Sequence, residues 1–427
     1  MNILVVGSGG REHAIIRKLK ENPAVDTVYA CPGNGGISYD AVCTGVKATD
    51  LEGVLACARE HSVDFVVVAP DDPLALGMVD CLEAAGFACF GPSKAAARIE
   101  SSKAFSKALM RKYSIPTADY EVFDDPGKAM AYIDGQGRYP VVVKADGLAL
   151  GKGVLICQNR EEAQEAVTDM LVGNKFGASG SRVVVEEFLT GPEVSVLAFA
   201  DGVTVRPMAS SMDHKRALDG DQGLNTGGMG TIAPNPHYTD AIAADCMETI
   251  FLPTLRAMAA EGCPFKGCLY FGLMLTPQGP KVIEYNCRFG DPETQVVLPL
   301  LQTDLLTIMQ AVAAGTLDRL DIRWRDSHAA CVVLASGGYP GSYPTGLPIA
   351  GLDQKGQLAD SDAVVYHAGT RLDGTALVTA GGRVLGVTAT GDTLAQAVQN
   401  AYAAADRISF EGLHRRSDIG QNALNAF

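Results

Sequence analysis

A lysine inside an apolar strand, followed by a glycine-rich loop and a second strand, is the feature that most restricts how this chain can fold. Residues 139–145 read YPVVVKA, residues 146–153 read DGLALGKG, and a strand returns at residues 154–157. Such a lysine is costly to bury unless its ammonium reaches water or an anion. Phosphate loops of the Walker type need a helix after the glycines. The segment therefore predicts a hairpin, either a plain one with surface lysines or a lid over a triphosphate.

A second stretch, residues 282–295, reads VIEYNCRFGDPETQ and begins in a predicted buried strand. Side chains alternate between the two faces of a strand, so Glu284, Asn286 and Arg288 are expected to project together. A carboxylate and an amide oxygen suit Mg²⁺, which takes its other ligands from water and nucleotide phosphates. A guanidinium beside them can hold phosphoryl or carboxylate oxygens. The alternative is a solvated acidic loop.

The chain begins with a short buried strand at residues 2–6, the glycines GSGG and a helix. This order lets an anion approach the N-terminus of the helix. A dinucleotide fingerprint would need a third glycine where Glu12 stands, and an acid after the strand at residues 27–30, where the chain reads CPGNGG. A sugar phosphate between two glycine loops fits better than NAD. A strand at 65–69 and a helix at 74–85 complete a parallel α/β domain.

Composition limits the architecture and the partners. At 427 residues the chain exceeds the roughly 250–300 residues that one core usually serves, so several domains are expected. A formal net charge of -14 argues against nucleic acid or an acidic membrane as the main partner. Transmembrane helices need about 18 or more apolar residues, and no run approaches this length. The 11 cysteines form no CxxC pair, which predicts thiols in a reducing, cytoplasmic compartment.

The polar stretch at residues 212–230 predicts a long functional loop. Within it, Asp213 and Lys215 are placed to orient an amino acid and its acyl phosphate. No Ser/His/Asp or Cys/His arrangement argues for a covalent enzyme. Beyond residue 327, strands at 328–336, 363–367 and 383–389 and a helix at 393–405 predict a small α+β domain. This domain is expected to close over the site or to be a structural cap, with Arg415 and Arg416 as anion contacts.

The order of Lys144, the glycine loop, Glu-Glu-Phe-Leu at 186–189 and Glu-x-Asn at 284–286 is similar to that of the ATP-grasp fold. The strings VVGSGGREHA, VKADGLALGKGV, EEFLTGPEVSVLAF, DHKR, NTGGMG and RFGDPETQ together resemble the glycinamide ribonucleotide synthetase (phosphoribosylamine–glycine ligase) family over nearly the whole chain. Two departures stand out. Asp71-Asp72 replaces a Pro-Glu-Ala type string, and Gly272 lies near the place of an extra metal glutamate in many ATP-grasp enzymes.

The resemblance implies a multidomain fold of mixed α/β and α+β class. It comprises an N-terminal parallel α/β domain binding ribosyl phosphate (1–101), a central ATP-grasp domain (102–326) with a mobile lid at about 120–189, and a C-terminal α+β domain (327–427). The implied reaction joins glycine to 5-phospho-β-D-ribosylamine through glycyl phosphate. It yields ADP, phosphate and N1-(5-phospho-β-D-ribosyl)glycinamide, the second step of purine (IMP) biosynthesis. Another ATP-grasp carboxylate–amine ligase, or an inactive nucleotide sensor, remains the alternative.

The resemblance also implies the site residues. The catalytic residues are Arg288, Asp213 and Lys215. ATP, a co-substrate, is bound by Lys107, Lys144, Gly151, Glu186, Glu187, Leu189 and Glu193. Ribosylamine and glycine are bound by Gly9, Gly10, Arg11, Glu12, Asn34, Gly36 and Asp291. Mg²⁺ or Mn²⁺ is bound by Glu284 and Asn286. The chain is expected to be a cytoplasmic monomer with small-molecule substrates and weak channelling contacts to neighbouring pathway enzymes.

Overall fold

The computed structural model describes residues 1–149, 153–173 and 180–425. Its N-terminal part is a five-stranded parallel sheet in the order β3-β2-β1-β4-β5. The strands are β1 (Asn2–Gly7), β2 (Thr27–Pro32), β3 (Val42–Cys43), β4 (Phe65–Val68) and β5 (Ala88–Phe90). The helices are α1 (Gly10–Leu19), α2 (Leu51–Glu60), α3 (Asp71–Leu76), α4 (Met78–Ala84) and α5 (Lys94–Ser101). The predicted N-terminal parallel α/β fold is confirmed.

One predicted helix is wrong in its extent, and another helical stretch is irregular. The helix expected at 74–85 is divided into α3 and α4 at Gly77, whose φ of 98° is left-handed and favours glycine. A further helical stretch in the central part consists of α9 (Asp240–Cys246), a π-helical segment (Met247–Phe251) and α10 (Leu252–Ala260). Pro253 has no N–H to donate to the preceding turn, which accounts for the irregularity beside it.

The central part is built on an antiparallel sheet in the order β11-β10-β16-β17. Its strands are β10 (Glu193–Asp201), β11 (Val205–Pro207), β16 (Lys266–Thr276) and β17 (Gly279–Asn286). Helices α6 (Lys103–Lys112), α11 (Thr294–Leu300) and α12 (Leu305–Ala314) complete this part together with α9 and α10. The stretch 282–295 thus leaves the last strand of the sheet and ends in a helix.

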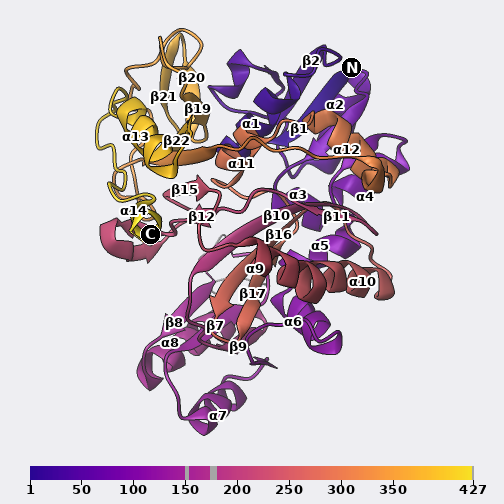
Figure 1. The fold of residues 1–427 in the computed structure, drawn as a ribbon, viewed down its shortest axis with the longest axis vertical. Coiled ribbons are helices and arrows are strands. Elements are labelled where there is room, and N and C mark those ends of the chain that lie inside the picture. The colour runs from indigo at the N-terminus through magenta and orange to yellow at the C-terminus, as the bar shows by residue number, and fades with distance from the viewer. Residues whose placement is uncertain (150–152, 174–179, 426–427) are drawn as a thin grey trace.

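The predicted lid is a separate layer, seen at the bottom of Figure 1, with its own antiparallel sheet in the order β6-β9-β7-β8. Its strands are β6 (Tyr120–Phe123), β7 (Val141–Ala145), β8 (Val154–Cys157) and β9 (Val183–Glu187), and its helices are α7 (Pro126–Gln136) and α8 (Arg160–Leu171). Buried Ile133, Val143 and Val167 belong to a hydrophobic cluster confined to this layer. The antiparallel pairing of β7 with β8 confirms the predicted hairpin.

The C-terminal sheet has the order β12-β15-β18-β22-β19 and draws on two distant parts of the chain. Its strands are β12 (Met212–Asp213), β15 (Gly230–Ala233), β18 (His328–Ala335), β19 (Val364–His367) and β22 (Arg383–Gly391). Two hairpins, a long helix and a short one accompany it: β13 (Arg216–Leu218) with β14 (Gln222–Asn225), β20 (Thr370–Asp373) with β21 (Ala376–Thr379), α13 (Leu394–Ala405) and α14 (Gln421–Leu424). In Figure 1, β12 and β15 lie beside the yellow C-terminal elements.

The prediction that residues 212–230 form a loop is wrong for most of that stretch. Strands β12 to β14 lie within it, and β15 begins at its last residue and pairs with β18 over Gly230–Ala233. These strands are polar, so the alternation of apolar residues that predicts a strand is missing. Their backbones can still pair, because the side chains on one face meet solvent or the site.

The C-terminal part is packed against the N-terminal one. Ile15 and Ile16 of α1 share a hydrophobic cluster with Cys331 of β18 and Tyr366 of β19. The anion contact predicted for Arg416 is wrong, whereas the one predicted for Arg415 stays a prediction. Arg416 is fully buried and ion-paired with Asp221 and Asp418, and Arg415 pairs with Asp406. Within the described ranges, no helix is both long and apolar enough to cross a bilayer.

Candidate active site

Three charged side chains meet in the interior where the lid joins the central part. Lys107 comes from α6, Lys144 from β7 and Glu186 from β9, and they are 2%, 4% and 4% exposed. The Lys107 Nζ lies 2.9 Å from Glu186 Oε2, and the Lys144 Nζ lies 3.0 Å from Glu186 Oε1. Lys144 also donates to the carbonyl of Ile283 in strand β17, 3.1 Å away. One carboxylate therefore pairs with both ammonium groups that the resemblance assigned to phosphate.

Burial sets the charge state of this cluster. Burial lowers the pKa of Lys107 to about 8, although the Glu186 carboxylate opposes the shift. Burial alone would raise the pKa of Glu186, but the charges of Lys144 and Lys107 hold it below its usual value. Two cations against one carboxylate leave an excess of positive charge, which favours a polyanionic ligand.

The loops on either side of this cluster position it. Ser102 caps α6 by accepting from the N–H of Phe105 at 3.1 Å, and its hydroxyl donates to Asp146 just after β7 at 3.0 Å. Lys103 donates to the carbonyl of Gly147 at 3.0 Å. The start of α6 is therefore tied to the beginning of the glycine loop, whose Gly151 lies outside the described residues.

The predicted adenine segment follows β9. The N–H of Glu187 donates to the carbonyl of Asp119 at 2.9 Å, so this N–H is occupied by protein. The Glu187 carboxylate lies 3.8 Å from the Lys281 ammonium. The nucleotide contacts assigned to Glu187 and Leu189 stay predictions.

Lys215 brings together the predicted ribose ligand and the predicted metal ligand. Its Nζ lies 3.0 Å from Glu193 Oε2 and 3.9 Å from Glu284 Oε1. The Glu193 carboxylate raises the pKa of Lys215 well above its usual value, so the ammonium stays charged. The structure thus assembles one cation between two acids that lie on different strands.

Glu284 and Asn286 form the predicted metal site at the end of β17. Glu284 is paired with Gly272 of β16, and a Cβ at Gly272 would lie 2.9 Å from the Glu284 Cγ, so glycine leaves room for this side chain. Burial opposes ionisation of Glu284, but Lys215 and Lys144 keep its pKa below the usual value. Among the described residues, no cluster of three or more His, Cys, Asp or Glu side chains could hold a metal. A carboxylate and an amide oxygen fit Mg²⁺ when phosphate oxygens complete its shell.

Arg288 is held by an acid that sequence analysis missed. Its Nη2 lies 3.0 Å from Glu100 Oε1 at the end of α5 and donates to Asn286 Oδ1 at 3.2 Å. Glu100 also accepts from the N–H of Cys287 at 2.7 Å. The buried Nε of Arg288 has no partner among the described residues, so the guanidinium retains one donor for a ligand.

Asp213 lies at the other side of the RFGDPE turn. Its buried Oδ1 has no hydrogen-bond partner among the described residues. Burial, together with the charge of Glu293, raises the pKa of Asp213 well above its usual value. A Cβ at Gly228 would lie 2.6 Å from that Oδ1 and 2.5 Å from the Cδ of Pro292, so the backbone at Gly228 packs directly against the carboxylate. Asp213 is thus an acid with an unused acceptor.

The predicted phosphate end of α1 is already occupied by carboxylates. Glu12 Oε2 accepts from the N–H of Gly9 at 2.6 Å, and Arg11 pairs with Glu12 Oε1 at 2.6 Å. Arg11 also donates to the carbonyl of Phe289 at 3.1 Å. Asp291 accepts from the backbone of Arg11 and from Gln295 Nε2 at 2.7 Å. Arg11 and Glu12 are buried and engaged with protein, whereas Asp291 faces the same end of the helix from another part of the chain.

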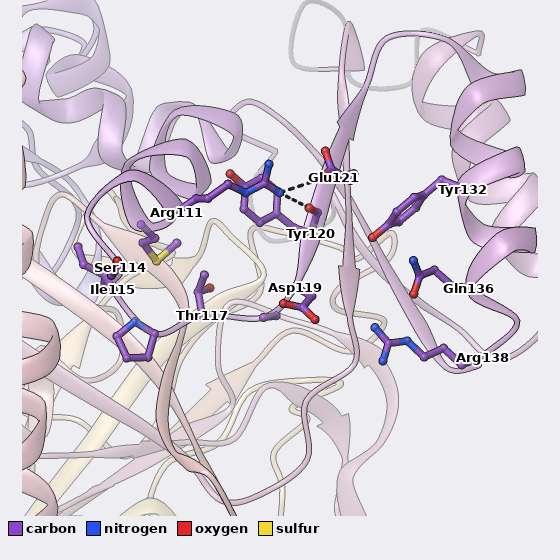
Figure 2. Close-up of a pocket in the computed structure, with 13 residues that line it drawn as sticks. Arg111, Ser114, Ile115, Thr117, Asp119, Tyr120, Glu121, Tyr132, Gln136 and Arg138 are labelled. Atoms are coloured by element: carbon purple, nitrogen blue, oxygen red, sulfur yellow. Dashed lines mark hydrogen bonds and ion pairs between the residues drawn. The ribbon is translucent and has the colours of Figure 1, made fainter.

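A polar hollow of about 450 Å³ lies at the root of the lid, lined by the end of α6, the 114–119 linker, β6 and α7 (Figure 2). Arg111 closes one side by donating to the Tyr120 carbonyl at 2.5 Å and to Glu121 Oε1 at 3.0 Å. Its lining includes no predicted site residue. It borders the lysine cluster at Thr117, whose Oγ1 accepts from Lys107 at 2.8 Å, and at Tyr120, whose ring centroid lies 5.5 Å from the Lys107 Nζ.

Known proteins match the chain over its whole length. Residues 1–100, 101–294 and 329–422 match the N domain, the ATP-grasp (A) domain and the C domain of phosphoribosylglycinamide synthetase. The phosphoribosylamine–glycine ligase of Yersinia pestis is 48% identical over 428 residues, which cover 99% of each chain. That of Agrobacterium fabrum is 48% identical over 424 residues, again 99% of each. The chain belongs to the phosphoribosylglycinamide synthetase family.

Solved structures agree with membership of the phosphoribosylglycinamide synthetase family. The phosphoribosylamine–glycine ligase of Thermotoga maritima has a TM-score of 0.87 and 34% identity, covering 98% of this chain and 100% of the other. A biotin carboxylase domain from Hydrogenobacter thermophilus, in complex with MgADP, has a TM-score of 0.74 at 19% identity, covering 96% and 91%. The latter likeness concerns the fold alone. The chain is an ATP-grasp ligase.

In this phosphoribosylglycinamide synthetase family member, several residues that hold the site together lie outside the sequence motifs. Arg383 donates to the carbonyls of Gly227 and Asp291, each at 2.6 Å, and so joins the NTGGMG segment (225–230) to the RFGDPE turn. Neither Arg383 nor Glu100 belongs to a motif that points to a ligand. Lys103 carried the one available signal, because it lies four residues before Lys107 on the same helix face.

Proposed function

We propose that this chain catalyses the ATP-dependent ligation of glycine to 5-phospho-β-D-ribosylamine. The products are ADP, phosphate and N1-(5-phospho-β-D-ribosyl)glycinamide, in the second step of purine biosynthesis. The observation that carries the proposal is the meeting of Lys107, Lys144 and Glu186 with the strand that ends in Glu284 and Asn286. The named relatives, phosphoribosylamine–glycine ligases, supply the identity of the two substrates.

The proposed chemistry proceeds through glycyl phosphate. A glycine carboxylate oxygen attacks the γ-phosphorus of ATP, and the bond to the bridging oxygen of ADP breaks. The ribosylamine nitrogen then attacks the carbonyl carbon, loses a proton, and displaces phosphate with the carboxylate oxygen that it carries. Positioning and charge neutralisation suffice for both steps.

The nucleotide is assigned to the lid side of the site. Lys107 and Lys144 take the phosphates, and a bound triphosphate competes with Glu186 for these ammonium groups. Glu186 and the backbone of Glu187 and Leu189 take adenine, and Glu193 takes the ribose hydroxyls. The proximity of Lys107 and Lys144 to one buried carboxylate supports this assignment, because the cluster carries surplus positive charge.

The amino acid and the metal are assigned to the opposite wall. Lys215 and Asp213 orient glycine and its acyl phosphate, with Arg288 alongside. Glu284 and Asn286 hold Mg²⁺ or Mn²⁺, which when bound would offset the charge of the phosphate oxygens. The distance of 3.9 Å between Lys215 and Glu284 supports a shared site for these groups.

The ribosylamine is assigned to the N-terminal side, near Gly9, Gly10 and Asp291. Asp291 accepts hydrogen bonds from its amino or hydroxyl groups. We also propose domains at 1–101, 102–326 with a lid at about 120–189, and 327–427, with the central range contributing β12 and β15 to the C-terminal sheet.

A cytoplasmic monomer with weak channelling contacts to neighbouring pathway enzymes completes the proposal. All 11 cysteines are free, and most are buried, which supports a reducing compartment. Sedimentation at micromolar concentration tests the monomer, and a shift to a dimer mass would contradict it.

Glycine labelled with heavy oxygen in its carboxylate tests the chemistry. We expect one labelled oxygen in the released phosphate and ADP as the nucleotide product. AMP with pyrophosphate, or phosphate without label, would exclude glycyl phosphate. Absence of ADP release with all substrates present would favour a nucleotide sensor instead.

A further inference from the structure

Asn34 joins the two glycine loops of the N-terminal part to each other and to the C-terminal part. Its Nδ2 donates to the carbonyl of Ser8 at 2.8 Å and to the carbonyl of His367 at 2.8 Å. Its Oδ1 accepts from the N–H groups of Gly36 at 2.9 Å and Ile37 at 2.8 Å. A side-chain amide offers two donors and two principal acceptor sites. All of them are engaged by protein, so Asn34 cannot bind a substrate without giving up a contact.

The backbone of the second glycine loop is engaged in the same way. The N–H of Gly33 donates to the carbonyl of Gly7 at 3.2 Å, and the N–H of Gly35 donates to the carbonyl of Thr370 at 3.0 Å. The Thr370 hydroxyl accepts a further, longer bond from the N–H of Gly36 at 3.3 Å. The N–H groups predicted to meet the sugar phosphate here are therefore used to fix the path of the loop.

His367 forms the surface on which the loop rests. A Cβ at Gly36 would lie 1.9 Å from the Cγ of His367, so only glycine can approach this ring. The N–H of His367 donates to His13 Nδ1 at 2.8 Å, which ties β19 to α1. His367 Nε2 lies 2.8 Å from the Gly356 carbonyl and must donate to it, which leaves Nδ1 to accept from Thr370 Oγ1 at 3.3 Å. The Thr370 hydroxyl thus links the ring to the loop.

We infer that Thr370 and His367 are positioning residues for the ribosylamine subsite, and that they act through Asn34 and the 33–36 loop. The identity of the ligand rests on the proposed function. The C-terminal part is then a fixed wall that shapes one substrate subsite. Its contribution is specific for the ribosylamine, because the lysine cluster that is assigned to ATP shares none of these contacts.

Thr370→Val is the direct test, because it keeps the shape of the side chain and removes the hydroxyl. The Thr370 hydroxyl makes two buried hydrogen bonds, to Gly36 and to His367, and each is worth about 0.5–1.5 kcal/mol, so we expect their loss to raise the KM for ribosylamine about fivefold or more. The KM for ATP and kcat are expected to stay within about twofold, and Thr370→Ser, which retains the hydroxyl, is expected to restore the wild-type KM.

Thr379→Val is the matched control. Thr379 is paired with Thr370 at the base of the same hairpin and is equally buried, but its Oγ1 accepts from Leu347 within the C-terminal part. We expect this variant to leave the KM for ribosylamine unchanged. If both valine variants raise that KM equally, or if Thr370→Val raises the KM values of both substrates together, the positioning role is wrong.

Amide hydrogen exchange over residues 33–37 separates this inference from the proposed function. Thr370→Val is expected to accelerate exchange in this segment, and Thr379→Val is not. Unchanged exchange in Thr370→Val would overturn the inference even in an active enzyme. Failure of the wild-type chain to consume ribosylamine would instead overturn the proposed function, while the exchange result would still decide whether Thr370 fixes the loop.

Discussion

The proposed nucleotide side and the proposed ribosylamine side of the candidate site are built from different groups. The nucleotide side relies on charged side chains, with Lys107 and Lys144 sharing one buried carboxylate. The ribosylamine side relies on backbone groups and on the amide of Asn34, whose hydrogen bonds are all made within the protein. The nucleotide side has surplus positive charge for a ligand to neutralise. On the ribosylamine side, the 33–36 loop has few hydrogen-bonding groups left for a ligand.

Because of this difference, we expect the two sides to respond differently to substitutions. A buried ion cluster loses function when one charge is removed, because the ligand's charge is then poorly matched. The network of Asn34 and the 33–36 loop should lose ribosylamine binding when its shape changes, because its hydrogen bonds fix the subsite instead of holding the ligand. Substitutions should therefore affect ATP and ribosylamine separately.

The largest effect is expected for Lys144→Ala. Removing the ammonium should lower kcat/KM for ATP by about 100-fold to 1,000-fold, the range seen when one charge-stabilising donor is lost. The fold should survive, since Glu186 keeps Lys107 as a partner at 2.9 Å. Steady-state kinetics with varied ATP measure the effect, and Lys128→Ala, at an exposed lysine of α7, is the control. Near-normal ATP kinetics would remove Lys144 from the nucleotide site.

Gly9→Val should break the other side, with a smaller effect. Its Cβ would lie 2.8 Å from Glu12 Oε2 and 3.2 Å from Asp291 Oδ2, so both carboxylates must shift. We expect the KM for ribosylamine to rise about tenfold, because that shift changes the subsite shape, at a cost of about 1.4 kcal/mol. The KM for ATP should stay within twofold. Gly135→Val, at a glycine with open space around its Cβ position, is the control. A rise confined to ATP would place the nucleotide in the N-terminal part.

Alkaline pH should weaken ATP binding while sparing ribosylamine binding through the Asn34 network. The pKa of Lys107 is about 8, below its usual value of 10.5, so its charge is present below pH 8 and is lost as pH rises through that value. The KM for ATP should rise by up to about tenfold per pH unit above 8. Lys107→Arg stays charged and should flatten this limb. An unchanged alkaline limb in that variant would assign the titration to another group.

Mild acid should act on stability rather than on either KM, with a loss at the contact between the N- and C-terminal parts. Burial lowers the pKa of His367 to about 3, with the neighbouring His13 adding to the shift. Asp40 and Arg17 also face this pair. Because the folded pKa lies below the unfolded value of 6.5, stability falls as pH drops from 6.5 towards 3. At pH 5 the loss is on the order of 2 kcal/mol for one such histidine.

Thermal unfolding at pH 7 and pH 5 measures this loss. His367→Gln keeps a donor for the Gly356 carbonyl but cannot titrate, so its midpoint should depend less on pH. Asp40 does not confuse the comparison. Although burial opposes it, the His13 hydrogen bond keeps the pKa of Asp40 below its usual 3.8. An equal pH dependence in wild type and His367→Gln would contradict the assignment.

The family, the α/β class and the local elements that carry chemical groups could be predicted from the sequence. Strand geometry and the cost of burying a charge act over a few residues. The sequence therefore sufficed to predict a strand around Lys144 and the alternation of Glu284, Asn286 and Arg288. The glycine loop between β7 and β8 was readable for the same reason. By contrast, strands β12 to β14 within residues 212–230 were missed, because the pairing of β12 with β15 and of β13 with β14 does not require an alternation of apolar residues.

Which of these groups are paired within the protein, and which remain available to a ligand, depends on the tertiary structure. Glu186 lies between two lysines on other elements, and Arg416, read as an anion contact, is consumed by Asp221 and Asp418. Asn34 reaches the carbonyl of His367 across 333 positions of sequence. Hydrogen-bond and ion-pair partners of this kind depend on how distant segments pack. A motif names a chemical group, but its partners determine whether that group has a bond left to give.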